Sequence, residues 1–145
     1  MDKERFENFQ PLDFLDLAKK SIEYLEEHSW NNSSLERNIF GRVYYGTFLY
    51  VREWLSSNTN DFNVENNGKD HKNIPNYIKS KGPFDEYTNI IISDNLKKLR
   101  KLRNQADYNL TIPDENSREF SRWNHSDVNH AIDLAEDIVN SFRNV

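Results

Sequence analysis

The stretch from residue 35 to residue 56 constrains the fold more than any other part of this sequence. An ordinary surface helix has one apolar stripe, whereas the apolar side chains here occupy almost every direction around a helical axis. They are Ile39, Phe40, Val43, Tyr44, Tyr45, Phe48, Leu49, Tyr50, Val51, Trp54 and Leu55. We therefore predict that residues 35–56 form a central helix, buried on most sides. Gly41 and Gly46 lower its helix propensity, and we expect them to mark a close approach of a neighbouring helix.

Three further segments each carry a single amphipathic stripe and are predicted to be long helices. The first spans residues 11–28, the second follows Ser93 to about residue 109, and the third follows Ser126 nearly to residue 145. Ser93 and Ser126 are the expected N-caps. A short helix is predicted over residues 71–78, capped by Asp70, and residues 87–92 are expected to pack on the core as helix or loop. The pattern predicts an all-α fold, an antiparallel bundle of four long helices plus a short one.

Length and composition indicate one domain over residues 1–145, with a polar lead-in at 1–10 and a mobile loop at 56–70. The chain has no cysteine, so disulfides and thiolate metal sites are excluded. No apolar run reaches the roughly 18 residues of a membrane-spanning helix, and the first residues lack the apolar core of a signal peptide. We expect a soluble cytoplasmic protein without membrane contact. We predict no metal and no cofactor, since no ligand cluster and no glycine-rich phosphate loop is visible.

The basic segment around residue 100 stands out in a chain whose net charge is −5. Its cations lie within two helical turns and are Lys97, Lys98, Arg100, Lys101 and Arg103. Arg103 and Asp107 are four residues apart, so their side chains can pair on one helix face. Arg100, Asn104 and Tyr108 run beside them. Two interpretations stay open, an ordinary solvated charged face and a binding site for an anion.

Three short motifs together resemble one family. They are Arg42-Val43-Tyr44-Tyr45-Gly46, then His71-Lys72, then Arg103-Asn104-Gln105-Ala106-Asp107-Tyr108. Their order and spacing resemble those of HEPN-domain proteins, particularly the small stand-alone group, over about residues 12–142. The resemblance implies a helical bundle that forms a homodimer. It also implies a metal-independent ribonuclease, either a toxin paired with a small nucleotidyltransferase antitoxin or a component of antiviral defence.

The resemblance also assigns site residues. The family's catalytic signature is an arginine followed four to six residues later by a histidine; Arg103 matches the arginine, but Tyr108 and Leu110 stand where the histidine would be. Arg103 is expected to bind the scissile phosphate, Asp107 to orient Arg103, and Tyr108 to donate a hydrogen bond. His71 is the candidate for the missing acid–base group. The expected binding residues are Lys97, Arg100, Asn104, Arg42 and Tyr44.

Each of these assignments has a structural alternative. Arg103 and Asp107 would then form a surface ion pair, His71 would be a structural histidine at a helix start, and the tyrosines at 44 and 45 would pack in the core. The function predicted first is a HEPN-type protein acting on RNA, as an endoribonuclease toxin or defence component. The alternative is a non-catalytic dimeric module that binds a nucleotide, nucleic acid or a partner protein. A third interpretation is a plain interaction bundle with a solvated basic helix.

A homodimer is also predicted from the residues, because the central helix carries more apolar surface than one bundle of this size covers. The face with Arg100, Arg103, Asn104 and Tyr108 is expected to line the cleft at the dimer axis.

Overall fold

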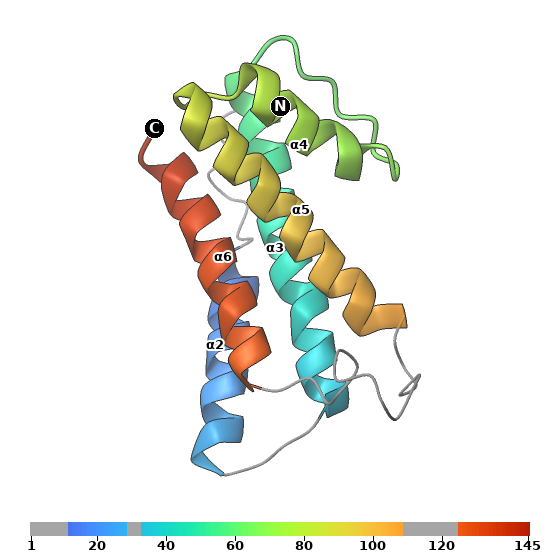
Figure 1. Ribbon diagram of the computed structural model, residues 1–145, viewed down its shortest axis with the longest axis vertical. Helices are drawn as coiled ribbons and strands as arrows, with labels where there is room; N and C mark the ends of the chain where they lie inside the picture. The colour runs from blue at the N-terminus through green and yellow to red at the C-terminus, as the bar shows by residue number, and fades with distance from the viewer. Residues whose placement is uncertain (1–11, 29–32, 109–124) are drawn as a thin grey trace.

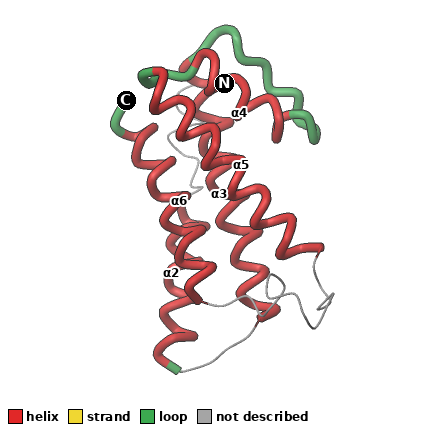
Figure 2. Tube along the Cα trace, viewed as in Figure 1, coloured by secondary structure: helices red, strands yellow, loops and turns green. Residues whose placement is uncertain are grey.

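The computed structural model describes residues 12–28, 33–108 and 125–145, which form an all-α helical bundle (Figures 1 and 2). The helices are α2 (Leu12–Glu27), α3 (Ser33–Asn58), α4 (Asp70–Lys81), α5 (Glu86–Tyr108) and α6 (His125–Arg143). In Figure 1, α2, α3, α5 and α6 run alternately down and up along the long axis, and the short α4 lies beside α5 at one end. The predicted fold, four long antiparallel helices plus a short one, is confirmed.

Helix α3 is the central element, as its all-round apolar pattern predicted. It packs against α2, α4, α5 and α6. Its largest fully buried side chains include Phe40 and Leu55, which are surrounded by residues from several helices. No described helix approaches Gly41 as predicted, because a Cβ added at this glycine would meet no described atom within 4 Å. Gly41 lies on a face of α3 that no other described helix approaches closely, so helix packing within the chain does not demand a glycine there.

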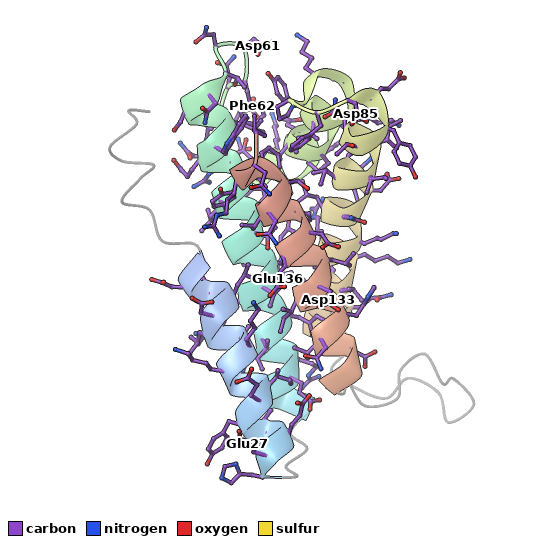
Figure 3. All side chains as sticks on the ribbon, turned by 90° about the vertical axis from the view of Figure 1, so that its left-hand side faces the viewer. Glu27, Asp61, Phe62, Asp85, Asp133 and Glu136 are labelled. Atoms are coloured by element: carbon purple, nitrogen blue, oxygen red, sulfur yellow. The ribbon has the colours of Figure 1, made fainter. Side chains whose placement is uncertain are left out.

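The outer helices supply the rest of the core through single stripes, as predicted. The buried residues of α2 and α6 recur at three- and four-residue spacing, which places them on one face of each helix. They are Leu15, Ala18, Ile22, Leu25, Val128, Ala131, Ile132, Ala135, Ile138, Val139 and Phe142. Figure 3 views the α2–α6 side and shows Asp133 and Glu136 on α6. Within the described ranges, no helix combines the length and the apolar composition that a bilayer span requires.

Helix α5 begins seven residues before the position predicted for its cap. Residues 87–92 are helical, and Asp85 caps the first turn, since its carboxylate accepts hydrogen bonds from the Thr88 N–H and hydroxyl, both at 2.8 Å. Ser93 is not an N-cap. It is fully buried inside the helix, where its hydroxyl donates to the Pro75 carbonyl at 2.8 Å and ties α5 to α4.

The connection between α4 and α5 is fixed by one buried amide. The Asn89 side chain accepts a hydrogen bond from the Phe84 N–H at 3.1 Å and donates to the carbonyls of Phe84 and Gly82. A side chain at Gly82 would collide with this amide, because an added Cβ would lie 2.3 Å from the Asn89 Oδ1. The α4–α5 hairpin is therefore held in one geometry, which sets the relative position of the residues facing its groove.

The segment before α4 also differs from its prediction. Asp70 does not cap α4, because the N-cap residue is Lys69, whose side chain makes no capping hydrogen bond. The buried Asp70 carboxylate instead accepts hydrogen bonds from the N–H groups of Glu65 and Asn66, at 3.1 and 3.0 Å. The loop is further tied to α4 because the Tyr77 hydroxyl donates to Asp61 at 2.6 Å. Helix α3 extends to residue 58, and the mobility predicted for residues 56–70 stays a prediction.

Candidate functional site

A groove of about 450 Å³ runs between α4 and α5, and we call it the basic groove. Helix α5 contributes side chains from residues 97, 100, 101, 104 and 105, which a 3.6-residue repeat places on one face. The opposite face, with Leu96, Leu99 and Ala106, is buried in the core. The lining residues are His71, Lys72, Pro75, Lys97, Arg100, Lys101, Asn104 and Gln105. The structure thus brings three predicted binding residues together, Lys97, Arg100 and Asn104, and sets His71 opposite them.

Among the described residues, the cations of this groove have no counter-charge. No described carboxylate lines the groove, and within the described ranges Lys72, Lys97, Arg100 and Lys101 make no ion pair. Cations that converge without counter-charges raise the local potential, even in a protein whose net charge is −5. The groove is therefore suited to an anion with several negative charges.

His71 is held at the edge of this groove by aromatic residues of α3. Its ring stacks on Phe48, with centroids 4.3 Å apart and planes 17° apart, and lies edge-on to Tyr45 at 6.1 Å. The Tyr44 hydroxyl is hydrogen-bonded to His71 Nδ1 at 2.5 Å. Residues 44 and 48 lie one turn apart, so both rings reach the same side of α3. This contact occupies Nδ1 and leaves Nε2 as the ring nitrogen that can meet a ligand.

The protonation states of this pair follow from its surroundings. Burial lowers the pKa of His71, and the positive charges of Arg100 and Arg103 lower it further, while the neighbouring Asp70 carboxylate opposes them. Burial likewise raises the pKa of the Tyr44 phenol. Near neutral pH the imidazole is therefore uncharged and the phenol protonated. When Nδ1 carries the imidazole proton and donates it to the phenol oxygen, Nε2 presents its lone pair and can accept a proton.

Arg103 lies on the side of α5 that faces α3. Its guanidinium carbon is 4.9 Å from the centre of the Tyr45 ring, a cation–π contact. Two long hydrogen bonds accompany it, from Nη2 to the Tyr45 hydroxyl at 3.4 Å and from Nη1 to the Asn104 Oδ1 at 3.5 Å. Tyr45 thus touches both Arg103 and His71, and it joins the two candidate catalytic residues that come from different helices.

The remaining predicted residues divide into two groups. Arg42 does not line the basic groove; it lines a second groove on the outer side of α2 and α3. The side chains of Asp107 and Tyr108 lie outside the described residues, so their predicted roles and the Arg103–Asp107 pair stay predictions. In the described ranges, no three carboxylate, imidazole or thiol groups gather where they could hold a metal ion.

The sequence analysis missed the aromatic support of the site. Tyr44 is buried, as core packing predicted, yet its hydroxyl also binds His71. Core packing is wrong for Tyr45, whose side chain is 39% exposed. Phe48 was assigned to the core alone. The sequence feature that could have predicted this support is the spacing of the aromatic residues at positions 44, 45 and 48. That spacing does not reveal which histidine the three rings contact.

Comparison with known proteins finds similarity to two uncharacterized proteins of Methanocaldococcus jannaschii. MJ0628 is 33% identical over 119 residues, which cover 72% of this chain and 66% of that protein. MJ0992 is 32% identical over 110 residues, covering 69% of this chain and 60% of that protein. The chain thus spans slightly less than two thirds of the length of these relatives. No protein-family model matches the chain, and no solved structure matches it significantly.

Proposed function

We propose that this protein binds single-stranded RNA in the basic groove and cleaves it as a metal-independent endoribonuclease of the HEPN type. The observation that carries the proposal is the position of His71. It lines the basic groove together with Arg100, is hydrogen-bonded to Tyr44, and lies 6.1 Å from the Tyr45 ring that Arg103 contacts. This arrangement offers a neutral base beside two cations. The resemblance to HEPN proteins supplies the reaction, and His71 takes the part of the histidine that the motif lacks.

Binding rests on the uncompensated cations. The phosphates of a strand would lie along Lys97, Arg100 and Lys101, with Lys72 on the facing helix. Such contacts release condensed counterions, which makes affinity strong at low salt and weak at high salt. A groove of about 450 Å³ that opens at the surface suits a single strand better than a rigid duplex.

The chemistry is an intramolecular attack by the ribose 2′-hydroxyl on the adjacent phosphorus. His71 Nε2 accepts the 2′-hydroxyl proton as the new P–O bond forms. Arg103 stabilises the negative charge that develops on the phosphoryl oxygens, because its planar guanidinium offers several donors. The bond from phosphorus to the 5′-oxygen breaks, and this oxygen takes a proton from water. The products are 2′,3′-cyclic phosphate and 5′-hydroxyl ends.

The expected partners belong to the same proposal. HEPN proteins of this kind imply a symmetric homodimer, and a toxin of this kind implies a small nucleotidyltransferase antitoxin encoded nearby. Light scattering at micromolar concentration is expected to give a mass of twice 17.3 kDa. A mass of one chain would remove the dimer from the proposal and leave the chemistry of the groove in place.

The experiment uses purified protein and a short single-stranded RNA, with and without EDTA. Cleavage is expected to continue in EDTA. We expect Arg103→Ala to slow it by about a hundredfold or more, as for loss of one preorganised donor to a developing oxyanion. His71→Ala is expected to slow it by a similar factor, since general base catalysis contributes on the order of 10²–10⁴. Lys19→Ala on α2, outside the basic groove, is the matched control and should cleave normally.

The outcomes separate the two candidate functions. Equal cleavage by wild type and Arg103→Ala would exclude this site as the source of activity. RNA binding without cleavage by the wild type, lost in Arg103→Ala, would favour the non-catalytic binding module, which the same uncompensated cations support. Absence of both binding and cleavage would leave the plain interaction bundle.

A further inference from the structure

A second groove, of about 560 Å³, lies on the outer side of α2 and α3, and we call it the outer groove. Its lining residues are Phe14, Asn38, Gly41, Arg42, Tyr45 and Leu49. Its described lining residues all come from α2 and α3. It differs from the basic groove because two aromatic rings and one leucine line it, together with one amide, one guanidinium and a glycine.

Tyr45 links the two grooves through its contacts, although it lines only the outer one. This ring lines the outer groove, while it also contacts the Arg103 guanidinium at 4.9 Å and lies 6.1 Å from the His71 ring. One aromatic ring therefore connects the outer groove with the residues proposed to act on the phosphate. A base stacked on this ring can belong to the same strand as a phosphate held at Arg103.

The chemistry of the outer groove matches a nucleobase. Tyr45 and Phe14 are both more than one third exposed, so each offers ring surface on which a flat group can stack. The Asn38 side chain is exposed and carries both a donor and an acceptor, the combination that the hydrogen-bonding edge of a base requires. Arg42 adds donors, and it makes no ion pair with any described residue.

Gly41 keeps this groove open. A Cβ at this position would meet no described atom within 4 Å, so no neighbour in the described ranges requires the glycine. Glycine inside a helix costs stability relative to any residue with a side chain other than proline. Its presence on the floor of a groove is explained when the groove must admit a ligand.

We propose that the outer groove is the base subsite for single-stranded RNA whose phosphate lies at Arg100 and Arg103. The proposal rests on the proposed function and extends it to a part of the substrate. The base stacks on Tyr45, its edge meets Asn38 and Arg42, and its ribose leads across Tyr45 to the phosphate beside His71. The substrate is then an unpaired strand, because a base in a duplex cannot leave its stack to enter the groove.

The test is Gly41→Leu, which fills the outer groove and raises the helix propensity of α3. Asn140→Leu on α6, whose residues line neither groove, is the matched control for an added leucine. Binding is measured for a fluorescent RNA oligonucleotide and, as a base-free polyanion, for inorganic polyphosphate. We expect Gly41→Leu to weaken RNA binding about tenfold, the range for losing one stacked base, while polyphosphate binding is unchanged. Asn140→Leu should change neither.

Circular dichroism of each variant establishes that the fold is retained, and Asn38→Ala provides a second variant that leaves the helix intact. Asn38→Ala is expected to change the preference among the four bases. Wild-type protein that binds no RNA would overturn the proposed function itself. If the wild type binds RNA and Gly41→Leu binds it with the same affinity, the base subsite alone would be overturned. Loss of both polyphosphate and RNA binding in Gly41→Leu would also overturn the base subsite. A changed sedimentation coefficient of this variant would overturn it too, because it would assign the outer groove to a contact with a second copy of the chain.

Discussion

The basic groove and the seam between α2 and α6 contain the same kinds of charged residues in opposite arrangements. In the seam, Lys19 forms an ion pair with Glu136, and this hydrogen bond is the main cause that raises the pKa of Lys19. A hollow of about 240 Å³ lies there as well, and its lining includes Asp16 and Glu136 beside Lys19 and Arg143. Figure 3 shows Glu136 on α6 on this side of the bundle.

The difference shows that a cation alone does not make an anion site. In the seam every cation has a carboxylate on the same lining, so the local charge is close to balanced. In the basic groove, Lys97, Arg100 and Lys101 of α5 lie across from Lys72 of α4, and no described carboxylate lines the groove with them. Only the second arrangement has a net field that attracts a polyanion, and it carries the cost of mutual repulsion.

Among the tests of this contrast between groove and seam, the largest expected effect concerns RNA affinity. Replacing Lys97 and Lys101 together by alanine should weaken binding of single-stranded RNA by about 25-fold at 0.1 M salt, because each lost phosphate contact removes about 0.7 from the salt slope. The slope of log affinity against log salt should fall by about 1.4. Fluorescence anisotropy over a salt series measures both. If Lys19→Ala in the seam weakened binding as much, the contrast between the two regions would be wrong.

The next effect concerns pH. Burial and the charges of Arg100 and Arg103 lower the pKa of His71 from its ordinary value of 6.5. Its imidazole therefore remains mostly neutral down to a somewhat lower pH than the imidazole of an ordinary histidine. A neutral base is required, so kcat/KM for cleavage should fall only when the pH drops below 6.5, and it should be flat above. Arg100→Ala removes one of the charges that disfavour the imidazolium and should move this acid limb to higher pH. NMR titration of the His71 ring follows the same shift without enzyme activity.

The control for this experiment is again Lys19→Ala, which lies outside the groove and should leave the acid limb in place. An acid limb that stayed fixed in Arg100→Ala, together with an unchanged His71 titration, would show that the groove cations do not act on this imidazole.

The smallest effect concerns stability. The Lys19–Glu136 pair is partly exposed, so a double-mutant cycle with Lys19→Ala and Glu136→Gln should give a coupling of only about 0–1 kcal/mol in the free energy of unfolding. Lys97→Ala should change this free energy by no more than about 0.5 kcal/mol, since it breaks no pair. Urea denaturation measures both. A large loss of stability in Lys97→Ala would reveal a structural role for that lysine.

Much of the fold was predictable because helix periodicity is a local property. The all-round apolar pattern of residues 35–56 identified the central helix, and single stripes identified α2 and α6. The start of α5 was missed because the isoleucines at 90–92 suit either helix or strand, and the Asp85 cap decides between them. The role of Asp70 was missed because a carboxylate at a helix start caps the helix in most proteins, whereas here it accepts two N–H groups of the preceding loop.

The sequence by itself determined that residues 97–103 carry a concentration of cations on one helix, and it placed Arg100 and Asn104 on one face together with Arg103 and Tyr108. The structure keeps Arg100 and Asn104 in the basic groove but turns Arg103 toward α3. Only the tertiary structure decided what that surface faces. The Tyr44–His71 hydrogen bond joins residues 27 positions apart, and the Arg103–Tyr45 contact joins residues 58 apart. Periodicity fixes directions around one axis, whereas contacts of this range depend on how the helices pack. Packing set His71 and Arg100 in one groove, brought Arg103 against Tyr45, and left the groove cations without a counter-charge among the described residues.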